Sequence, residues 1–228
     1  LDKIVKEVKI AVDDGVNIVI LSDRGVSKSM APIPMALACS YVHHSSISQK
    51  IRSKFGIIIE SGEPREPHHF AVLFGYGASA INPYMVNEII TYQVENKKLH
   101  NITVENAIDN FNKAIAKGII KIMNKIGIST LLSYRGSQIF EALGLNEKFI
   151  NKYFTNTPTR IEGIGLYEVE KEISKRHHSA YKSLAVEGTM DLEIGGSYRW
   201  RRSGEAHMFN PATISKLQQA VRQNKYET

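Results

Sequence analysis

The stretch NIVILSDRG (residues 17–25) places a short β-branched apolar run directly before a polar loop. The same order returns in GIIIESGEPRE (56–66) and, in a shorter form, in SAINPY (79–84). Segments that favour helices follow each of the three loops. Apolar strands that alternate with helices indicate a parallel sheet, so the expected fold class is α/β with repeated βα units.

Four helices are predicted around these strands. The first carries apolar residues at helical spacing from Ile4 to Val12, before a glycine, Gly15, at a typical helix end. The others are expected from Pro32 or Pro34 to about Ser46, over 68–76 and over 84–96. Since the carboxyl ends of parallel strands share one edge, loops 22–25, 60–66 and 82–84 are expected to converge there.

A polar break at residues 97–101 separates this part from a long amphipathic helix. Thr103 is suited to cap that helix, and Gly127 to end it. We therefore predict domains at 1–102 and 103–228. Beyond the long helix the sequence predicts a strand over 128–134 and a short helix to Ala142. Three more helices are expected: one capped by Asn146, one over 166–181 and one opened by Asn210-Pro211. An exposed strand or hairpin is expected from Gly195 through Tyr198 to Trp200.

Composition narrows the classes of function. Lys and Arg number 29 and Asp and Glu 23 among 228 residues, and this net charge of +6 is spread along the chain, which argues against nucleic acid as a partner. The one cysteine, Cys39, cannot build a disulfide or an iron–sulfur cluster alone. We expect no membrane span and a reducing, cytoplasmic setting. The opening at Leu1 suggests a piece of a longer protein.

Several residue clusters are candidates for chemistry. The histidine pairs at 43–44, 68–69 and 177–178 lack the spacing of metal ligands, so no metal site is predicted. The charged loop at 60–66 is better explained by structural ion pairs than by acid–base catalysis. Residues 121–136 bring hydroxyl groups behind a helix end, and these could line a flavin or oxoacid pocket, or could belong to a buried strand whose hydroxyls bond the backbone.

Six longer blocks of this sequence closely resemble the large, flavin-containing chain of glutamate synthase. The blocks are collinear and extend over nearly the whole chain. They are ILSDRGV (20–26), ESGEPREPHHF (60–70), LFGYGASAINPY (73–84), KIMNKIGISTLLSYRGSQIFEALGL (121–145), YFTNTPTRIEGIGL (153–166) and WRRSGEAHMFNP (200–211).

The resemblance implies an oxidoreductase that makes two glutamates from glutamine and 2-oxoglutarate, in glutamate biosynthesis and ammonia assimilation. An amidotransferase domain releases ammonia, which is channelled to a synthase domain where FMN reduces 2-iminoglutarate. The electron donor is ferredoxin or an NAD(P)H-linked subunit, and a plastid location is implied if the source is a photosynthetic eukaryote. Residues 1–102 would form the carboxy-terminal part of the central domain. Residues 103–228 would open the FMN-binding domain, including the first strand region of an incomplete (β/α)8 barrel.

This implied enzyme is much larger than the chain. The three-iron four-sulfur cluster of the family needs a cysteine triplet, so it would belong to the full enzyme only. The chain holds no catalytic residue of the family and is expected to be inactive by itself. FMN is not expected to stay bound, because one barrel strand cannot enclose a flavin. An alternative function is a structural connector that docks the amidotransferase domain to the synthase domain.

By the same resemblance, the cofactor-binding candidates lie at the end of the long helix and just beyond it. They are Met123, Lys125, Gly127, Ile128, Ser129 and Thr130, followed in second line by Ser133, Tyr134, Arg135 and Gln138. Lys125 would meet an anionic flavin or a carboxylate such as that of 2-oxoglutarate, and Gly127 would let the backbone approach the ring. Asn124 and Ile126 depart from the usual Ser and Met of the family.

Overall fold

The computed structural model describes residues 1–182, 195–196 and 199–224. Contacts divide the chain into two compact units, Leu1–Tyr181 and Lys182–Thr228, and each is described by itself. Among the described residues, no helix combines the length and the apolar character that crossing a bilayer requires.

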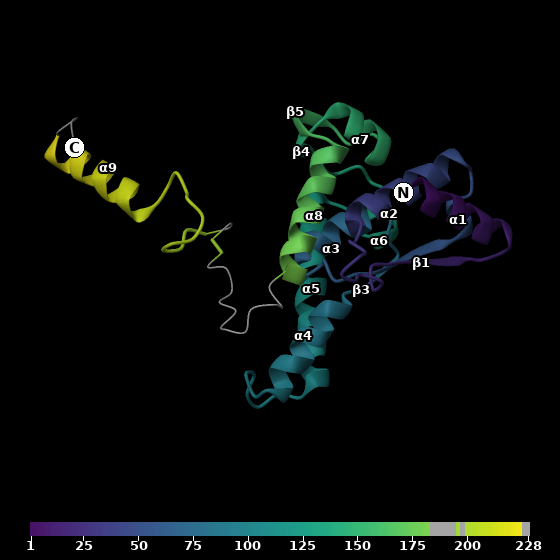
Figure 1. Ribbon diagram of the computed structural model, residues 1–228, viewed down its shortest axis with the longest axis horizontal. Helices are drawn as coiled ribbons and strands as arrows, with labels where there is room; N and C mark the ends of the chain where they lie inside the picture. Colours follow the sequence, from purple (N-terminus) through teal and green to yellow (C-terminus); the bar gives the residue numbers. More distant parts are fainter. Residues whose placement is uncertain (183–194, 197–198, 225–228) are drawn as a thin grey trace. The chain divides into compact units, whose positions relative to one another are not determined.

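A three-stranded parallel sheet lies in the first unit (Figure 1). Its strands are β1 (Ile18–Ser22), β2 (Gly56–Glu60) and β3 (Ala80–Asn82), in the order β1-β2-β3. In this register Ile20 lies opposite Ile58, and Ile58 opposite Ala80. The α/β class with repeated βα units, expected from the sequence, is confirmed.

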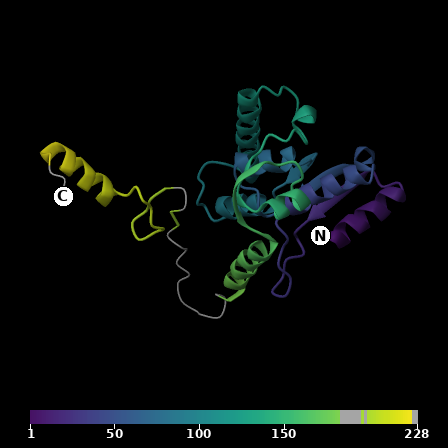
Figure 2. The same ribbon diagram turned by 90° about the horizontal axis from the view of Figure 1, so that it is seen from above.

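Three helices cover one face of this sheet. They are α1 (Asp2–Asp13), α2 (Met35–Ser48) and α3 (Pro67–Gly75). Helices α1 and α2 lie side by side above β1 (Figures 1 and 2). Right-handed crossovers along a sheet of order β1-β2-β3 place the connecting helices on the same face, and the core forms there. Its buried members include Val8, Val12, Leu21, Met35, Ala38, Cys39, Val42, Ile57, Ile59 and Leu73.

Two further helices, α4 (Tyr84–Glu95) and α5 (Val104–Ile126), follow β3. The Thr103 hydroxyl accepts a hydrogen bond from the Asn106 N–H, and Gly127 ends α5 with φ +81°, both as predicted. Helix α5 packs against α3 and α4. A side chain at Gly118 would collide with Pro67, so this glycine allows α5 to approach the start of α3 closely. The domain boundary at 102/103 stays a prediction.

The predicted strand over 128–134 is wrong, because residues 131–134 form a short helix, α6 (Leu131–Tyr134). The Thr130 hydroxyl caps this helix by accepting from the Ser133 N–H at 3.2 Å. In this helical turn the Tyr134 side chain is fully buried. An extended backbone would direct that side chain elsewhere. The predicted strand would have been the first strand of a (β/α)8 barrel, and this start of a barrel is therefore not seen among the described residues.

The predicted helix ending at Ala142 is also wrong. Gly136 and Gln138 have φ values of +70° and +54°, which a continuous helix excludes, and residues 142–145 form β4 (Ala142–Leu145). β4 pairs in parallel with β5 (Thr159–Ile164), a strand that the sequence analysis missed. Between them lies α7 (Glu147–Tyr153), capped by Asn146 as predicted.

The predicted helix over 166–181 is confirmed as α8 (Leu166–Lys182). The second unit contains α9 (Pro211–Gln223), which begins at Asn210 with a capping box that Thr213 completes. This helix was also predicted. The expected strand from Gly195 to Trp200 is not present at its described residues, and Tyr198 lies outside them.

Candidate functional site

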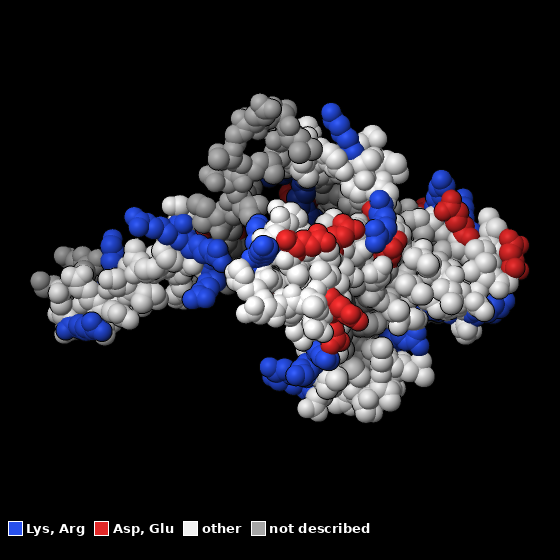
Figure 3. Space-filling view, turned by 90° about the horizontal axis from the view of Figure 1, so that it is seen from below, with Lys and Arg blue, Asp and Glu red and all other residues white. Residues whose placement is uncertain are grey.

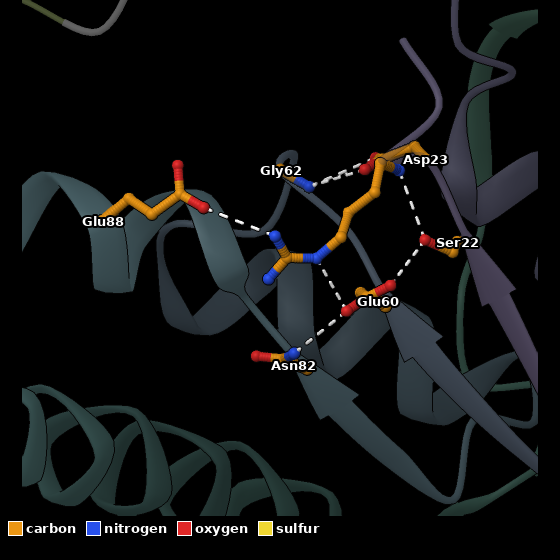
Figure 4. Close-up of polar contacts among 7 residues, drawn as sticks. Ser22, Asp23, Glu60, Gly62, Asn82 and Glu88 are labelled. Atoms are coloured by element: carbon orange, nitrogen blue, oxygen red, sulfur yellow. Dashed lines mark hydrogen bonds and ion pairs between the residues drawn. The ribbon is translucent and has the colours of Figure 1, made fainter.

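The three loops that follow the parallel strands meet at the carboxyl edge of the sheet, as predicted. The register places Ser22 opposite Glu60 and Glu60 opposite Asn82, so their side chains share one face. The Ser22 hydroxyl donates to Glu60 Oε2 at 2.6 Å, and Asn82 Nδ2 donates to Glu60 Oε1 at 3.4 Å (Figure 4). Glu60 therefore joins the ends of all three strands.

Arg24 joins this edge to helix α4. Its Nε donates to Glu60 Oε1 at 2.8 Å, and one of its terminal nitrogens donates to Glu88 Oε1 at 3.4 Å (Figure 4). The guanidinium also lies 4.2 Å from the centre of the Tyr84 ring. The hydrogen bonds from Ser22 and Arg24 lower the pKa of Glu60, and the same pairing with Glu60 raises the pKa of Arg24.

Hydrogen bonds to the buried Asp23 carboxylate fix the second loop, residues 60–66. This carboxylate accepts from the Ser61 hydroxyl at 2.6 Å and from the Gly62 N–H at 3.1 Å. The Ser61 oxygen in turn accepts from the Glu63 N–H, and Glu63 Oε2 accepts from the N–H of Met35 at 2.7 Å. Burial raises the pKa of Glu63. A buried carboxylate is costly unless hydrogen-bonded, so these bonds fix the loop around it.

The polar groups at this edge of the sheet have a structural role. Its strong acceptors are bonded to protein donors, and Glu60 and Arg24 neutralise each other. The expected ion-pair network exists, but its cation at Glu60 is Arg24 and not the neighbouring Arg65. Within the described part of the chain, no group of three or more His, Cys, Asp or Glu side chains is placed to hold a metal ion.

Charge over the first unit is mixed in sign. Figure 3 shows acidic and basic side chains interspersed on the visible side, with uncharged areas between them. This mixture on the visible side matches the spread of charge along the sequence.

A second candidate site lies at the end of α5. Met123, Gly127, Ile128 and Ser129, all predicted cofactor residues, line a hollow of about 370 Å³. Ile120 and Asn124 complete its wall. The predicted residues Lys125 and Thr130 do not line it: Lys125 is exposed, and Thr130 caps α6.

Gly127 leaves this hollow open. Its φ of +81° is a left-handed conformation that favours glycine, and a side chain there would meet no atom within 4 Å. Met123 and Ile128 give the wall apolar surface, and Ser129 and Asn124 give it hydrogen-bonding groups. These residues fit one edge of a flavin ring. The lining includes no Lys or Arg for a flavin phosphate.

The second-line residues are used partly to anchor the segment. The hydroxyl of the buried Tyr134 donates to the Ala71 carbonyl at 3.2 Å, and Arg135 Nη1 donates to the Ser79 hydroxyl at 2.6 Å. Both bonds tie the segment to the α/β sheet and its helices. Ser133 and Gln138 are exposed.

His43 contributes to this anchoring, although the sequence suggested only a histidine pair. Its Nδ1 accepts from Arg52 Nε at 2.9 Å, and its ring packs against Gly77 and Gly136. Burial, with the nearby positive charge of Arg52, lowers the pKa of His43 to about 3. No local sequence signal marks this role, because Gly77 and Gly136 lie far from His43 in the sequence and meet its ring only in the fold.

A parallel sheet built from successive βα units, with polar loops joined at its carboxyl edge, defines an α/β domain. The sequence model of the glutamate synthase central domain matches residues 1–146, and the chain belongs to this family. The chain is 44% identical over 216 residues to the glutamate synthase [NADPH] large chain of Bacillus subtilis, which covers 95% of this chain and 14% of that protein.

Two other relatives carry different names. The chain is 40% identical to the glutamate synthase [NADH] of Schizosaccharomyces pombe, across 100% of this chain and 11% of that protein. It is 37% identical to the ferredoxin-dependent glutamate synthase of Pyropia yezoensis, across 93% of this chain and 14% of that protein. The chain thus spans a small part of each relative's length.

Proposed function

We propose that this chain is the connecting segment of a glutamate synthase, the enzyme that forms two glutamates from glutamine and 2-oxoglutarate. The supporting observation is that relatives named for NADPH, NADH and ferredoxin are all similar across at least 93% of this chain. A segment common to all three kinds serves a task that does not depend on the electron donor. Joining and positioning the catalytic domains is such a task.

The geometry of the carboxyl edge supports the same role. Hydrogen bonds and an ion pair within this chain hold Arg24, Glu60 and Asp23 in place. The edge would therefore be a rigid support against which another domain packs. The reaction itself would occur in other domains, and residues 1–228 alone would be inactive.

The hollow at the end of α5 would supply one wall of the FMN and 2-oxoglutarate site. Bound FMN would provide the hydride for reducing 2-iminoglutarate. Met123 and Ile128 would contact the apolar ring, the Ser129 hydroxyl would offer it a hydrogen bond, and Gly127 would leave the space that the ring needs. Contacts to the flavin phosphate would come from elsewhere.

Flavin content of the full-length enzyme tests this role. Gly127→Val adds a side chain at the wall of the hollow. Gly15→Val adds the same side chain at a glycine that also has a positive φ (+91°) and no atom within 4 Å, but that does not line the hollow. We expect Gly127→Val to lower the FMN bound per polypeptide, measured by absorbance, and Gly15→Val to retain it. Equal FMN content in the two variants would contradict the proposal.

The isolated chain gives a second measurement. Titration of residues 1–228 with FMN, followed by quenching of flavin fluorescence, is expected to show no saturable binding because the phosphate contacts are missing. Saturable micromolar binding would show instead that the hollow is a usable pocket without the rest of the enzyme.

A further inference from the structure

The outer edge of β1 has no partner strand among the described residues. The Asn17 carbonyl accepts from the Gly56 N–H at 2.9 Å, and the Asp23 N–H donates to the Glu60 carbonyl at 3.1 Å, so both residues face β2. Backbone groups of successive strand residues point to opposite sides. Ile18 and Ile20 therefore direct their N–H and C=O groups away from β2.

This edge lacks the features that protect the outer strands of sheets. Natural edge strands use charges, prolines or bulges to avoid pairing with other chains. β1 reads IVILS, without a charge or a proline, and it pairs with β2 in an unbroken register. A continuous apolar run is typical of a strand in the interior of a parallel sheet.

A groove of about 470 Å³ runs beside this strand. Its floor is formed by β1, including Val19 and Leu21, and its walls are α1 on one side and the loop 25–33 on the other. Ile4, Val26 and Ile33 make these walls mainly apolar. Glu7 and Asp23 also contribute to the lining, but most of the lining residues are apolar, so the groove suits an extended, mainly apolar peptide segment.

At β1, the described residues also leave the face of the sheet opposite α1, α2 and α3 uncovered. Ile18 is 55% exposed and Ile20 60% exposed on that face. Parallel sheets are normally covered on both faces. The crossovers along β1-β2-β3 all run in one direction and place their helices on one face of the sheet. A helix on the other face therefore requires a further strand beyond the outer edge of β1, reached by a crossover that runs in the opposite direction.

We propose that a further β-strand pairs with the outer edge of β1, and that a helix connected to this strand covers Ile18 and Ile20. The same polypeptide supplies it, from outside residues 1–228. Two observations support this source: the chain spans only 11–15% of the relatives' length, and the groove is mainly apolar, as the site of a buried strand would be. The loop 22–25 then lies where strand order reverses, the position at which open α/β sheets bind ligands.

Amide hydrogen exchange at single residues of the full-length polypeptide tests the added strand. The Val19 and Leu21 amides, which bond to β2, are the internal reference. If β1 has a partner on both sides, Ile18 and Ile20 exchange at rates within about 10-fold of that reference. Exchange of Ile18 and Ile20 faster by about 1,000-fold would overturn the proposal.

Two matched variants of the full-length protein test the covered face. Ile20→Thr replaces a side chain that the proposal buries, and Ile10→Thr replaces one that is 62% exposed on α1. We expect the thermal midpoint to fall further for Ile20→Thr. Equal falls in the thermal midpoint would refute the intramolecular strand. Protection of the Ile20 amide that appears only as protein concentration rises would also refute it, and would indicate that a second copy of the chain pairs with β1.

Discussion

Arg24 Nε lies 2.8 Å from Glu60 Oε1, although 36 residues separate these side chains along the sequence. The parallel pairing of β1 with β2 brings them together, because it sets Ser22 opposite Glu60 and leaves Arg24 just beyond the strand end. The ion pair therefore reports on the register of the sheet.

Double-mutant cycles measure how strongly Arg24 interacts with each of its two acidic partners, Glu60 and Glu88. We expect the coupling between Arg24→Ala and Glu60→Gln to exceed that between Arg24→Ala and Glu88→Gln, since the Glu60 contact is 2.8 Å and the Glu88 contact 3.4 Å. The free energy of urea unfolding gives both couplings. Equal couplings would show that Glu88 is as strong a partner.

Acid should destabilise the protein partly through His43. Its pKa is lowered to about 3 in the folded state, below the value of about 6.5 expected for an unfolded chain. Between these values the unfolded state binds a proton that the folded state does not, so stability falls as pH drops from about 6.5 toward 3. His44, whose pKa burial also lowers, acts with the same sign.

The variant His43→Gln separates this contribution. Glutamine keeps an acceptor for Arg52 Nε but does not titrate, so we expect a smaller loss of stability between pH 6.5 and about 4 than in the parent chain. Urea midpoints across this range provide the measurement. An unchanged slope with pH would mean that other groups cause the acid sensitivity.

Two glycines with positive φ should respond differently to alanine. A side chain at Gly77 would strike the His43 ring, whereas one at Gly127 would meet no atom within 4 Å. We expect Gly77→Ala to cost about 2–4 kcal/mol, from strain and overpacking together, and Gly127→Ala about 1 kcal/mol, from strain alone. Similar losses in urea unfolding would argue against the packing of His43 on Gly77.

Tyr134 offers a test of the anchoring of α6. Tyr134→Phe removes the bond to the Ala71 carbonyl from a fully buried ring, and we expect a loss of about 1 kcal/mol. The control Tyr92→Phe changes a ring that is 54% exposed and should shift stability by less than about 0.5 kcal/mol. Equal losses would leave the buried bond without a measurable role.

Much of the fold could be predicted where the signal is local. Thr103, Asn146 and Asn210 cap the helices that the sequence assigned to them, because a cap needs only a side-chain oxygen two or three residues before its donor. The βα units were recognised for a similar reason, since a continuous apolar run followed by a polar loop repeats within a short distance.

The errors fall where local signals conflict. The run ISTLLSY (128–134) suits a buried strand or a helical turn equally well by pattern, and the cap at Thr130 decides for the helix. β4 and β5 were missed because each holds a glycine that strand propensity disfavours. Gly163 packs directly on the Gly144 backbone, a contact that only the pairing of two distant strands creates.

The sequence by itself determined the family, the α/β class, the helix caps and the convergence of three loops at one edge. All of these depend on residues near one another in the chain or on the regular alternation of strand and helix patterns. Only the tertiary structure decided that Glu60 pairs with Arg24 rather than with Arg65, that His43 packs against Gly77, and that one edge of β1 has no partner strand among the described residues. Those features depend on register and helix packing, which bring together groups far apart in the chain.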